Sequence, residues 1–340
     1  MKNSISQLLG LAGTVTPARL INSTKVLTGF WRSRFTGNTS HPGLPMSLSV
    51  EPTTSCNLRC PECPSGLRSF TRPTGMLDPV LFEKILRESY RHVQYLTFYF
   101  QGEPFLHPQF LELVKLARKF NIYTVTSTNG HYLNEETARK IVESGLNKLI
   151  VSVDGATQET YEQYRIGGTL EKVLEGTRRV VDWKKKLRLR TPAVELQMLV
   201  VRPNEHELDA VAKQGTSIGV DSIVFKTAQV YDFEKGHPLI PTDQRYSRYV
   251  QRSDGSWKIK NSLENHCWKM WHSCVITWDG NVVPCCFDKD ANYVMGNLKE
   301  ASLREIWNSP RYRSFREQLF NGRSSIDICR NCTEGTKVFE

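Results

Sequence analysis

Long apolar runs are missing from this chain, and so is a recognisable export leader. No run approaches the roughly 20 apolar residues that a membrane-spanning helix requires, so we expect no membrane partner. The start, Met1 to Leu11, has one lysine and a short apolar patch that no small-residue cleavage site follows. This pattern predicts a partly helical extension rather than a signal peptide.

A basic face with interleaved aromatic side chains is not recognisable either. The net charge of +10 is spread along the chain, and local basic runs at 184–188 and 311–316 are typical of solvated helix faces. Since nucleic-acid binding concentrates such charge on one face, we expect no nucleic-acid partner. An acidic substrate or an acidic peptide is compatible with the positive charge.

Cysteines spaced for a disulfide framework are the third absence. The nine cysteines gather instead as a triad near residue 60 and a group near the carboxyl end. Clusters of this kind favour metal binding, and metal-bound thiols favour a reducing, cytoplasmic compartment. With 39% hydrophobic and 24% charged residues, the composition is typical of a globular protein long enough for one large domain and one small one.

The triad is the most specific feature that is present. Cys56, Cys60 and Cys63 lie within eight residues, directly after a predicted strand at 47–51. Two prolines interrupt the segment, so it is predicted to be a loop that turns its sulfurs inward. Grouped thiolates suit zinc or an iron–sulfur cluster. Because a closed structural zinc site needs four ligands, three thiols leave one metal position open. A zinc knuckle or buried thiols are the alternative interpretations.

Strands and helices alternate from residue 46 onwards. N-cap residues and prolines open the predicted helices, as Asp78-Pro79 does for the first of them. Asn204 with Glu207 predicts a capping-box helix start. The predicted strands are 47–51, 95–100, 122–127, 148–153, 193–201 and 222–226. Apolar strands separated by helices predict a parallel sheet covered by helices, and this pattern alone allows an open sheet or a barrel.

The spacing Cys-x3-Cys-x2-Cys after the first strand resembles the signature of the radical S-adenosylmethionine (radical SAM) enzymes. This resemblance implies an α/β fold, an incomplete (β/α)6 barrel, with Cys56, Cys60 and Cys63 holding three irons of a [4Fe–4S] cluster. It also implies that the fourth iron binds SAM, and that reductive cleavage yields a 5′-deoxyadenosyl radical that abstracts a substrate hydrogen. Chemistry in such folds gathers at the carboxyl ends of the strands. One departure is Glu62, where the family usually has an aromatic residue.

Turns at other strand ends resemble the SAM-contacting motifs of the same family. Gln101-Gly102-Glu103 resembles its Gly-Gly-Glu motif, with glutamine in place of the first glycine. Asn129 after the third strand and Ser152 at the end of the fourth match positions near SAM. Arg165 resembles an arginine often paired with the SAM carboxylate. Plain turns and a surface arginine are the alternative interpretations.

The carboxyl-terminal cysteines resemble the SPASM accessory domain of this family. Asp279-Gly280 predicts a hairpin with a two-residue turn that brings Cys285 near Cys267. The spacing around this glycine and a final Cys-x2-Cys carry the resemblance. It implies one auxiliary [4Fe–4S] cluster on Cys267, Cys285, Cys329 and Cys332. Cys274 and Cys286 are left over as alternative ligands or packed thiols, and a zinc-ribbon-like site is the other interpretation.

These patterns divide the chain into an N-terminal extension (1–45), the barrel (46–227), a mostly irregular connector (228–266) and the SPASM domain (267–340). The resemblance implies a radical SAM oxidoreductase or maturase that uses SAM, two [4Fe–4S] clusters and a flavodoxin- or ferredoxin-type electron donor. A peptide or protein substrate is expected first, and a small metabolite is the alternative. A non-catalytic metal-binding scaffold, which Glu62 and Gln101 would favour, and a zinc-dependent nucleic-acid binder are rival hypotheses. The sequence assigns no catalytic side chain.

Overall fold

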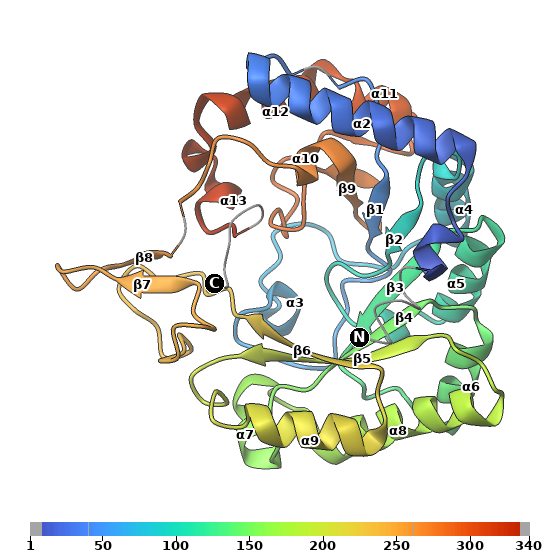
Figure 1. Ribbon diagram of the computed structural model, residues 1–340, viewed down its shortest axis with the longest axis vertical. Helices are drawn as coiled ribbons and strands as arrows, with labels where there is room; N and C mark the ends of the chain where they lie inside the picture. Colours follow the sequence, from blue (N-terminus) through green and yellow to red (C-terminus); the bar gives the residue numbers. More distant parts are fainter. Residues whose placement is uncertain (1–8, 40, 261, 334–340) are drawn as a thin grey trace. The chain divides into compact units, whose positions relative to one another are not determined.

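The computed structural model describes residues 9–39, 41–260 and 262–333 (Figure 1). The predictions for residues 1–8 and 334–340 therefore lie outside the described residues. Backbone contacts divide the chain into two compact units. Of the described residues, the first unit comprises 9–39, 41–55, 70–126 and 264–333, and the second unit comprises 56–69, 127–260 and 262–263. Both units combine segments that are far apart in the sequence.

The sheet of the first unit combines strands from both ends of the chain. Its parallel strands are β1 (Ser47–Val50), β2 (Tyr95–Thr97), β3 (Tyr123–Thr128, whose last two residues belong to the second unit) and β9 (Ser273–Ile276). β9 lies beside β1, with Ser273 opposite Ser47. Two short antiparallel strands extend the sheet beyond β9, namely β10 (Asn281–Val283) and β11 (Gly296–Asn297). The carboxyl-terminal cysteine segment therefore shares a sheet with β1.

Two predicted helices of the first unit, α4 (Pro79–Ser89) and α5 (Phe110–Lys119), follow β1 and β2 along the chain. The Asp78 side chain caps α4 by accepting from the backbone N–H of Val80, as the Asp-Pro pair predicts. Phe82 of α4 is fully buried and stacks on Phe98, with ring centroids 4.7 Å apart. Burial of such a ring stabilises the fold by about 1.5–3 kcal/mol.

The N-terminal helix α2 (Pro17–Thr36) is attached to the first unit through a buried arginine. Arg19 is 2% exposed and donates to the carbonyl oxygens of Thr14, Tyr90, Phe120 and Asn121. Three of these carbonyls lie at the ends of α4 and α5, where a cation offsets the helix dipole. The local pattern did not predict this anchor, because it does not show which residues meet distant carbonyls. Although α2 has 20 residues, no helix in the described ranges combines the length and apolar character needed to cross a membrane.

Short helices complete the first unit: η1 (Pro104–Leu106), α10 (Lys269–His272), α11 (Leu303–Trp307), α12 (Pro310–Gly322), η2 (Arg323–Ser325) and α13 (Asp327–Arg330). Trp271 and Trp307 are fully buried among them beside His41. Nε2 of His41 lies 3.0 Å from the carbonyl oxygen of Trp271, and Nδ1 lies 2.9 Å from the carbonyl oxygen of Gly43, which also accepts from Nε1–H of Trp307 at 3.0 Å. Burial, with a further contribution from the positive charge of Arg316, lowers the pKa of His41 to about 3.

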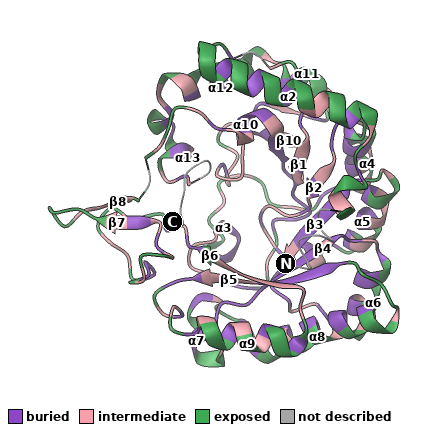
Figure 2. Cartoon of the chain, in the orientation of Figure 1, coloured by how far each residue is buried: buried purple, intermediate pink, exposed green. Residues whose placement is uncertain are grey.

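The second unit contributes the parallel strands β4 (Lys148–Ser152), β5 (Ala193–Val200) and β6 (Ser222–Thr227). Its helices are α3 (Pro64–Leu67), α6 (Glu135–Glu143), α7 (Gln158–Tyr164), α8 (Leu170–Lys186) and α9 (Leu208–Ile218). In Figure 2 the strands β4 and β5 are mostly buried, whereas α6 and α8 keep exposed faces. These elements confirm the predicted α/β class with parallel strands.

The predicted capping box at Asn204 and Glu207 is wrong, because α9 begins at Leu208 and both side chains bind elsewhere. Oδ1 of Asn204 accepts from the backbone N–H of Val201 at 2.8 Å. The Glu207 carboxylate accepts from the backbone N–H of Ala156 at 2.6 Å. The two residues have the spacing of a capping box, but their side chains accept hydrogen bonds from backbone N–H groups outside α9.

The turn between β9 and β10 is longer than the predicted two residues. The N–H of Thr277 donates to the carbonyl of Asn281 at 2.9 Å, which leaves a three-residue loop closed by Gly280 with a φ of 93°. A turn followed by a left-handed residue is a common alternative to the two-residue hairpin.

The segment 228–266 contains a hairpin that the sequence did not predict. Its strands are β7 (Tyr249–Gln251) and β8 (Trp257–Ile259), and they pair antiparallel. Each strand has only three residues, so no run of alternation was long enough to reveal it.

Candidate cluster and cofactor site

The cysteine loop lies in the second unit and is held by backbone hydrogen bonds between residues three or four positions apart. Cys63 occupies the N-cap position of α3, which Pro64 opens. The N–H of Cys63 donates to the carbonyl of Cys60 at 3.3 Å, and the N–H of Leu67 donates to that of Cys63 at 2.8 Å. Cys60 is 5% exposed, whereas Cys56 and Cys63 are half-buried. The segment is therefore a tight loop, as its prolines predict.

Gly66 is required by this loop, although the sequence analysis did not single it out. A Cβ at this position would lie 2.5 Å from the nitrogen and 2.7 Å from the oxygen of Cys60. Any other residue would displace the backbone of the central cysteine. A glycine three positions after the last cysteine was the available signal.

The loop packs on an apolar cluster that residues 228–266 help to build. Leu58 and Cys60 belong to this cluster, and Cys56 and Cys63 pack against it. Its other buried members are Tyr164, Val201, Ala228, Val230, Leu239, Ile240 and Tyr249. The segment expected to be a mostly irregular connector is thus one wall of the site, and such a wall controls solvent access to a bound metal group.

Glu62, the departure from the family pattern, ties the loop to the same wall. Its carboxylate accepts from the backbone N–H of Tyr231 at 3.0 Å and lies 3.6 Å from Nε2 of His237. The residue has structural partners within the second unit. Its presence therefore does not by itself favour an inactive scaffold.

Asn129 and Ser152, two of the predicted SAM contacts, lie at the ends of β3 and β4. Nδ2–H of Asn129 donates to Oδ1 of Asn57 at 2.7 Å, and the same nitrogen lies 3.8 Å from Sγ of Cys56. Ser152 is 6% exposed, as the last residue of β4. The structure brings Asn129 to the cysteine loop and buries Ser152 at its strand end.

Arg165, the third predicted contact, ends α7 beside the central cysteine. Its Nη1 lies 3.8 Å from Sγ of Cys60, and its Nε–H donates to the buried carboxylate of Asp154. Burial alone would lower the pKa of Arg165, but Asp154 raises it well above the ordinary value. A permanently charged donor therefore faces the cysteine sulfur, and hydrogen bonds of this kind tune iron–sulfur clusters.

The three thiols suit a cluster better than a single metal ion. Within the described ranges, no group of three or more Cys, His, Asp or Glu side chains could hold one metal ion together. A [4Fe–4S] cluster instead gives each cysteine its own iron, so its ligands stand further apart than those of a tetrahedral zinc. Burial raises the pKa of Cys60 to about 11, an effect that Arg165 opposes. Binding of a metal group through this sulfur would release its proton.

The predicted Gly-Gly-Glu-like motif belongs to the first unit. Gly102 has a φ of 73°, and a Cβ there would lie 2.3 Å from the carbonyl oxygen of Thr53, so glycine is required. The N–H of Glu103 donates to the carbonyl of Ser55 at 2.7 Å. The Glu103 carboxylate caps η1 by accepting from the N–H of Phe105 at 3.2 Å. Gln101 is 7% exposed, so the whole turn is packed against the backbone that precedes the cysteine loop.

Four carboxyl-terminal cysteines line one narrow cavity of the first unit. Three of them are buried and Cys285 is half-buried. The other residues around the cavity are mostly apolar: Met270, Phe287, Phe315, Leu319 and Ile328. The four cysteines are those that the resemblance implies, Cys267, Cys285, Cys329 and Cys332. The set fits a cluster held by four thiolates in a dry setting.

An arginine also faces the sulfurs of this cavity. Nη2–H of Arg323 donates to Sγ of Cys332 at 3.3 Å, and Nη1–H donates to the carbonyl of His266 at 2.9 Å. Burial raises the pKa of Cys329 to about 11, and Arg323 opposes this shift. The sequence analysis did not identify this arginine, because it lies in none of the recognised motifs.

The two remaining cysteines do not line this cavity. Cys274 lies in β9 and is 1% exposed, and burial raises its pKa to about 12. Cys286 follows Cys285 but lines a different cavity, where its Sγ lies 3.4 Å from Nζ of Lys269.

Two family models match the chain. The radical SAM superfamily matches residues 50–221, and an iron–sulfur cluster-binding domain, SPASM, matches residues 267–333. The first match covers the cysteine loop and all of the predicted SAM contacts, namely Gln101, Gly102, Glu103, Asn129, Ser152 and Arg165. The second match covers all four cysteines of the auxiliary cavity.

Known relatives match most of the chain. A tungsten-containing aldehyde ferredoxin oxidoreductase cofactor-modifying protein of Pyrococcus furiosus is 27% identical, over 79% of this chain and 82% of that protein. The PqqA peptide cyclase of Gluconobacter oxydans is 25% identical, over 86% of this chain and 83% of that protein. Among solved structures, Streptococcus suis SuiB bound to precursor peptide SuiA has a TM-score of 0.63 at 14% identity, over 94% of this chain and 76% of SuiB. This likeness confirms the expected fold.

Proposed function

This chain belongs to the radical SAM superfamily, and from that premise we propose that it modifies a peptide or protein substrate by hydrogen abstraction. It is an enzyme of a family that uses SAM and a [4Fe–4S] cluster, and its SPASM domain binds iron–sulfur clusters. The substrate class is supported by the similarity to the PqqA peptide cyclase over most of both chains.

The loop cysteines Cys56, Cys60 and Cys63 are proposed to hold the SAM-binding cluster. When bound, the cluster and SAM supply a 5′-deoxyadenosyl radical for hydrogen abstraction. The chain itself supplies the apolar bed beneath the loop and the donors of Asn129 and Arg165, which stand 3.8 Å from two of the three sulfurs. These N–H donors beside the loop sulfurs are the observation that carries the assignment of the SAM-binding cluster to this loop.

The predicted SAM contacts are proposed in different roles. Asn129 and Arg165 are at the sulfurs and are polar, so they suit the polar end of SAM. Ser152 supplies a hydroxyl at a strand end. Because the Glu103 carboxylate caps η1, we assign the backbone of Gln101-Gly102-Glu103, rather than that carboxylate, to the SAM ammonium.

The auxiliary site is proposed to hold one [4Fe–4S] cluster on Cys267, Cys285, Cys329 and Cys332. Its ligands surround a narrow apolar cavity, so the cluster would be fully ligated and would serve as an electron acceptor or a structural brace. We further propose a flavodoxin- or ferredoxin-type electron donor, and a cytoplasmic setting in which the nine thiols stay reduced.

Isotope transfer from a peptide tests this function. The protein is reconstituted anaerobically with iron and sulfide and incubated with SAM, a strong reductant and deuterated peptides corresponding to any short reading frames beside its gene. Deuterium in 5′-deoxyadenosine, together with a changed peptide mass, is the expected result. SAM cleavage without deuterium transfer from any such peptide would contradict the peptide substrate, and no cleavage by fully loaded protein would contradict the radical SAM activity.

A small metabolite is the second candidate substrate, and one observation favours it. The first unit contains a cavity of about 590 Å³, within the size range of small-molecule sites. Incubation with amino-sugar or polyol metabolites under the same conditions separates the two candidates.

A further inference from the structure

The N-terminal helix α2 is apolar on two opposite faces. One face packs on the first unit, where the ring of buried Phe30 lies 5.1 Å from that of Trp268 and 5.7 Å from that of Trp271, centroid to centroid. The other face is exposed along most of the helix, as Figure 2 shows. It carries five large apolar side chains, which together are named the apolar stripe: Leu20, Ile21, Leu27, Trp31 and Phe35. Exposed apolar patches of this kind mark interaction sites.

The stripe follows the helical repeat. Leu20, Leu27 and Trp31 are spaced by seven and four residues, and Phe35 follows after four more. Residues at these intervals lie on the same side of a helix. Trp31 and Phe35 stack with ring centroids 5.9 Å apart, and Phe35 is 80% exposed. The stripe therefore forms one apolar ridge along α2 rather than a set of scattered surface residues.

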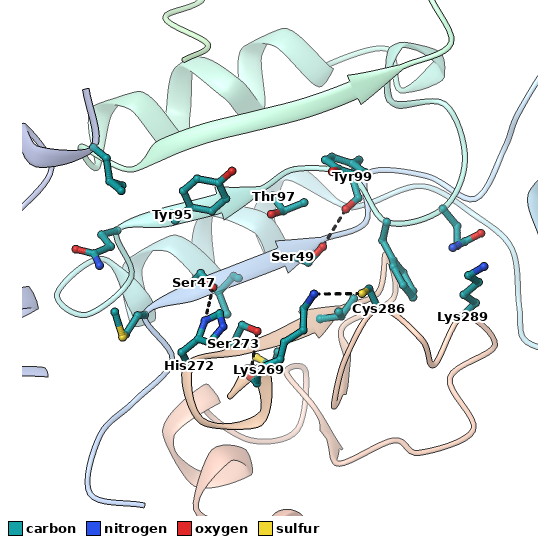
Figure 3. Close-up of a pocket in the computed structure, with 18 residues that line it drawn as sticks. Ser47, Ser49, Tyr95, Thr97, Tyr99, Lys269, His272, Ser273, Cys286 and Lys289 are labelled. Atoms are coloured by element: carbon teal, nitrogen blue, oxygen red, sulfur yellow. Dashed lines mark hydrogen bonds between the residues drawn. The ribbon is translucent and has the colours of Figure 1, made fainter. Parts of the chain in front are cut away.

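The helix cannot turn this stripe inward, because its opposite side is fixed to the first unit. The guanidinium of Arg19 binds four carbonyl oxygens that belong to three separate segments. Nδ2–H of Asn22 donates to the carbonyl of Leu44 at 2.8 Å. Leu11, just before α2, lines the cavity of about 590 Å³ whose wall residues are drawn in Figure 3. A rotation that buried the stripe would break these contacts, so only another molecule can cover it.

Basic residues border the stripe, and acidic residues are absent from the sequence around it. At about 3.6 residues per turn, Lys25 and Arg32 fall on one border and Arg34 falls on the other. No Asp or Glu precedes Glu51, whereas the whole chain contains 35 of them. Glu264 lies 3.9 Å from Arg34, but both side chains are about half exposed, so this pair offsets little of the charge. The exposed face of α2 is therefore apolar in the middle and positive at its edges.

We propose that α2 binds the surface of an anionic lipid bilayer, with the apolar stripe at the boundary of headgroups and acyl chains and Lys25, Arg32 and Arg34 against lipid phosphates. A helix with leucine and aromatic side chains on one face and basic side chains beside them lies in the plane of the interface. The expectation of no membrane partner rested on the absence of long apolar runs, and it concerns spanning helices only. This inference goes beyond the proposed function and does not depend on it.

Charge and length favour a bilayer over a protein partner. Two copies of the chain joined through the stripe would bring their basic borders into one interface, where the exposed face of α2 offers no acidic side chain to pair with them. The stripe from Leu20 to Phe35 extends over about four turns. A protein partner would need an apolar groove of the same length, whereas a bilayer supplies that surface without a specific groove.

Vesicle flotation tests the proposal with the full-length, anaerobically reconstituted protein. Vesicles of phosphatidylcholine mixed with phosphatidylglycerol are compared with vesicles of phosphatidylcholine alone. Binding to the mixed vesicles is expected to be about ten- to hundredfold tighter, because each basic residue near an anionic surface contributes a factor of about five. High salt should remove this difference, since it screens the surface charge.

Substitutions in the two parts of the face should act differently. Trp31→Gln and Phe35→Gln should each weaken binding to both kinds of vesicle by about tenfold. Arg32→Gln should weaken binding to the mixed vesicles by about fivefold and leave binding to phosphatidylcholine unchanged. The matched controls are Val80→Gln, at an exposed valine of α4, and Lys115→Gln, at an exposed lysine of α5, and both should bind like wild type. Iron content and circular dichroism check that each variant is folded.

Brominated acyl chains locate the contact. They should quench the tryptophan fluorescence of wild type more than that of Trp31→Phe, which keeps the stripe apolar and should still bind. Equal binding to both kinds of vesicle, no binding at millimolar lipid, or unchanged affinity in Trp31→Gln and Phe35→Gln would overturn the proposal. Without vesicle binding, a dimer or a complex with an acidic electron-transfer protein that is lost in Trp31→Gln would assign the stripe to a protein partner and would overturn the proposal as well.

Discussion

The two cysteine sites of this protein are built in opposite ways. The loop site takes its three cysteines from eight consecutive residues, and polar side chains of Asn129 and Arg165 stand beside its sulfurs. The auxiliary site takes four cysteines from three separate segments and surrounds them mostly with apolar side chains. A locally encoded, polar site suits a cluster that exchanges a cosubstrate, whereas a site assembled by packing suits a cluster that stays closed.

One device is common to both sites. Arg165 places Nη1 3.8 Å from Sγ of Cys60, and Arg323 places Nη2 3.3 Å from Sγ of Cys332. In each case burial raises a cysteine pKa and the arginine opposes the shift. Cationic donors therefore favour the thiolate form that a metal requires, whether the site is open or closed.

The largest expected effect comes from the loop. Cys60→Ala should abolish 5′-deoxyadenosine formation and reduce the iron content from about eight to about four per chain, because only the auxiliary cluster remains. Iron and acid-labile sulfide analysis with product chromatography measures both. Cys274→Ala is the matched control, since it removes a buried thiol of β9 and should leave both values unchanged. Retained cleavage in Cys60→Ala would refute the assigned ligand.

The corresponding change in the auxiliary site should have a different signature. Cys329→Ala should also lower the iron to about four per chain, but it should leave substrate-free SAM cleavage measurable. Because this cluster joins three segments, its loss should lower the unfolding temperature by roughly 5 °C or more, which scanning calorimetry records. An unchanged unfolding temperature would show that the cavity packs without its cluster.

The adjacent cysteines Cys285 and Cys286 test which of the two thiols is a ligand of the auxiliary cluster. Cys285→Ser should lose about four irons, whereas Cys286→Ser should keep about eight, because the two residues line different cavities. Electron paramagnetic resonance of the reduced proteins distinguishes the two clusters. Equal losses in both variants would mean that either thiol can ligate.

The arginines of the two sites offer a smaller, functional contrast. Arg165→Lys keeps the charge but loses the planar fork, so the dissociation constant for SAM should rise about tenfold. Arg323→Lys should leave SAM affinity unchanged, because Arg323 faces the auxiliary cysteines. Equilibrium dialysis with labelled SAM measures both, and equal effects would contradict the division of roles.

The smallest effect is expected from pH. His41 packs beside α10, which follows Cys267, and its pKa falls from 6.5 to about 3 on folding. Since the unfolded chain binds the proton more readily, stability is complete above pH 6.5 and is lost as pH falls toward 3. Between about pH 7.5 and about pH 5.5, wild type should lose about 1.4 kcal/mol that His41→Gln does not lose. Denaturant titrations followed by tryptophan fluorescence check this difference.

Sequence reasoning succeeded where the information was local. The loop geometry follows from cysteine spacing and two prolines, and the strand ends follow from apolar segments that stop at Asn129 and Ser152. The apolar wall from residues 228–266, the Arg19 anchor and the arginine beside Cys332 could not be predicted, because each depends on contacts between distant segments. The capping box predicted at Asn204 failed for the same reason. The residue has the expected spacing to Glu207, but its side chain accepts from the backbone N–H of Val201 instead of capping a helix.

The parallel pairing of β9 with β1 has a consequence for synthesis on the ribosome. Ser47 emerges early, but its partner Ser273 emerges only when most of the chain has been translated. Until then one edge of β1 has unsatisfied backbone groups, which is the kind of edge that other chains can pair with. A nascent chain that stops before β9 is therefore exposed to misassembly. Because β9 lies between Cys267 and Cys285 in the sequence, the strand that completes this edge of the sheet is part of the segment that joins two cysteines of the auxiliary site.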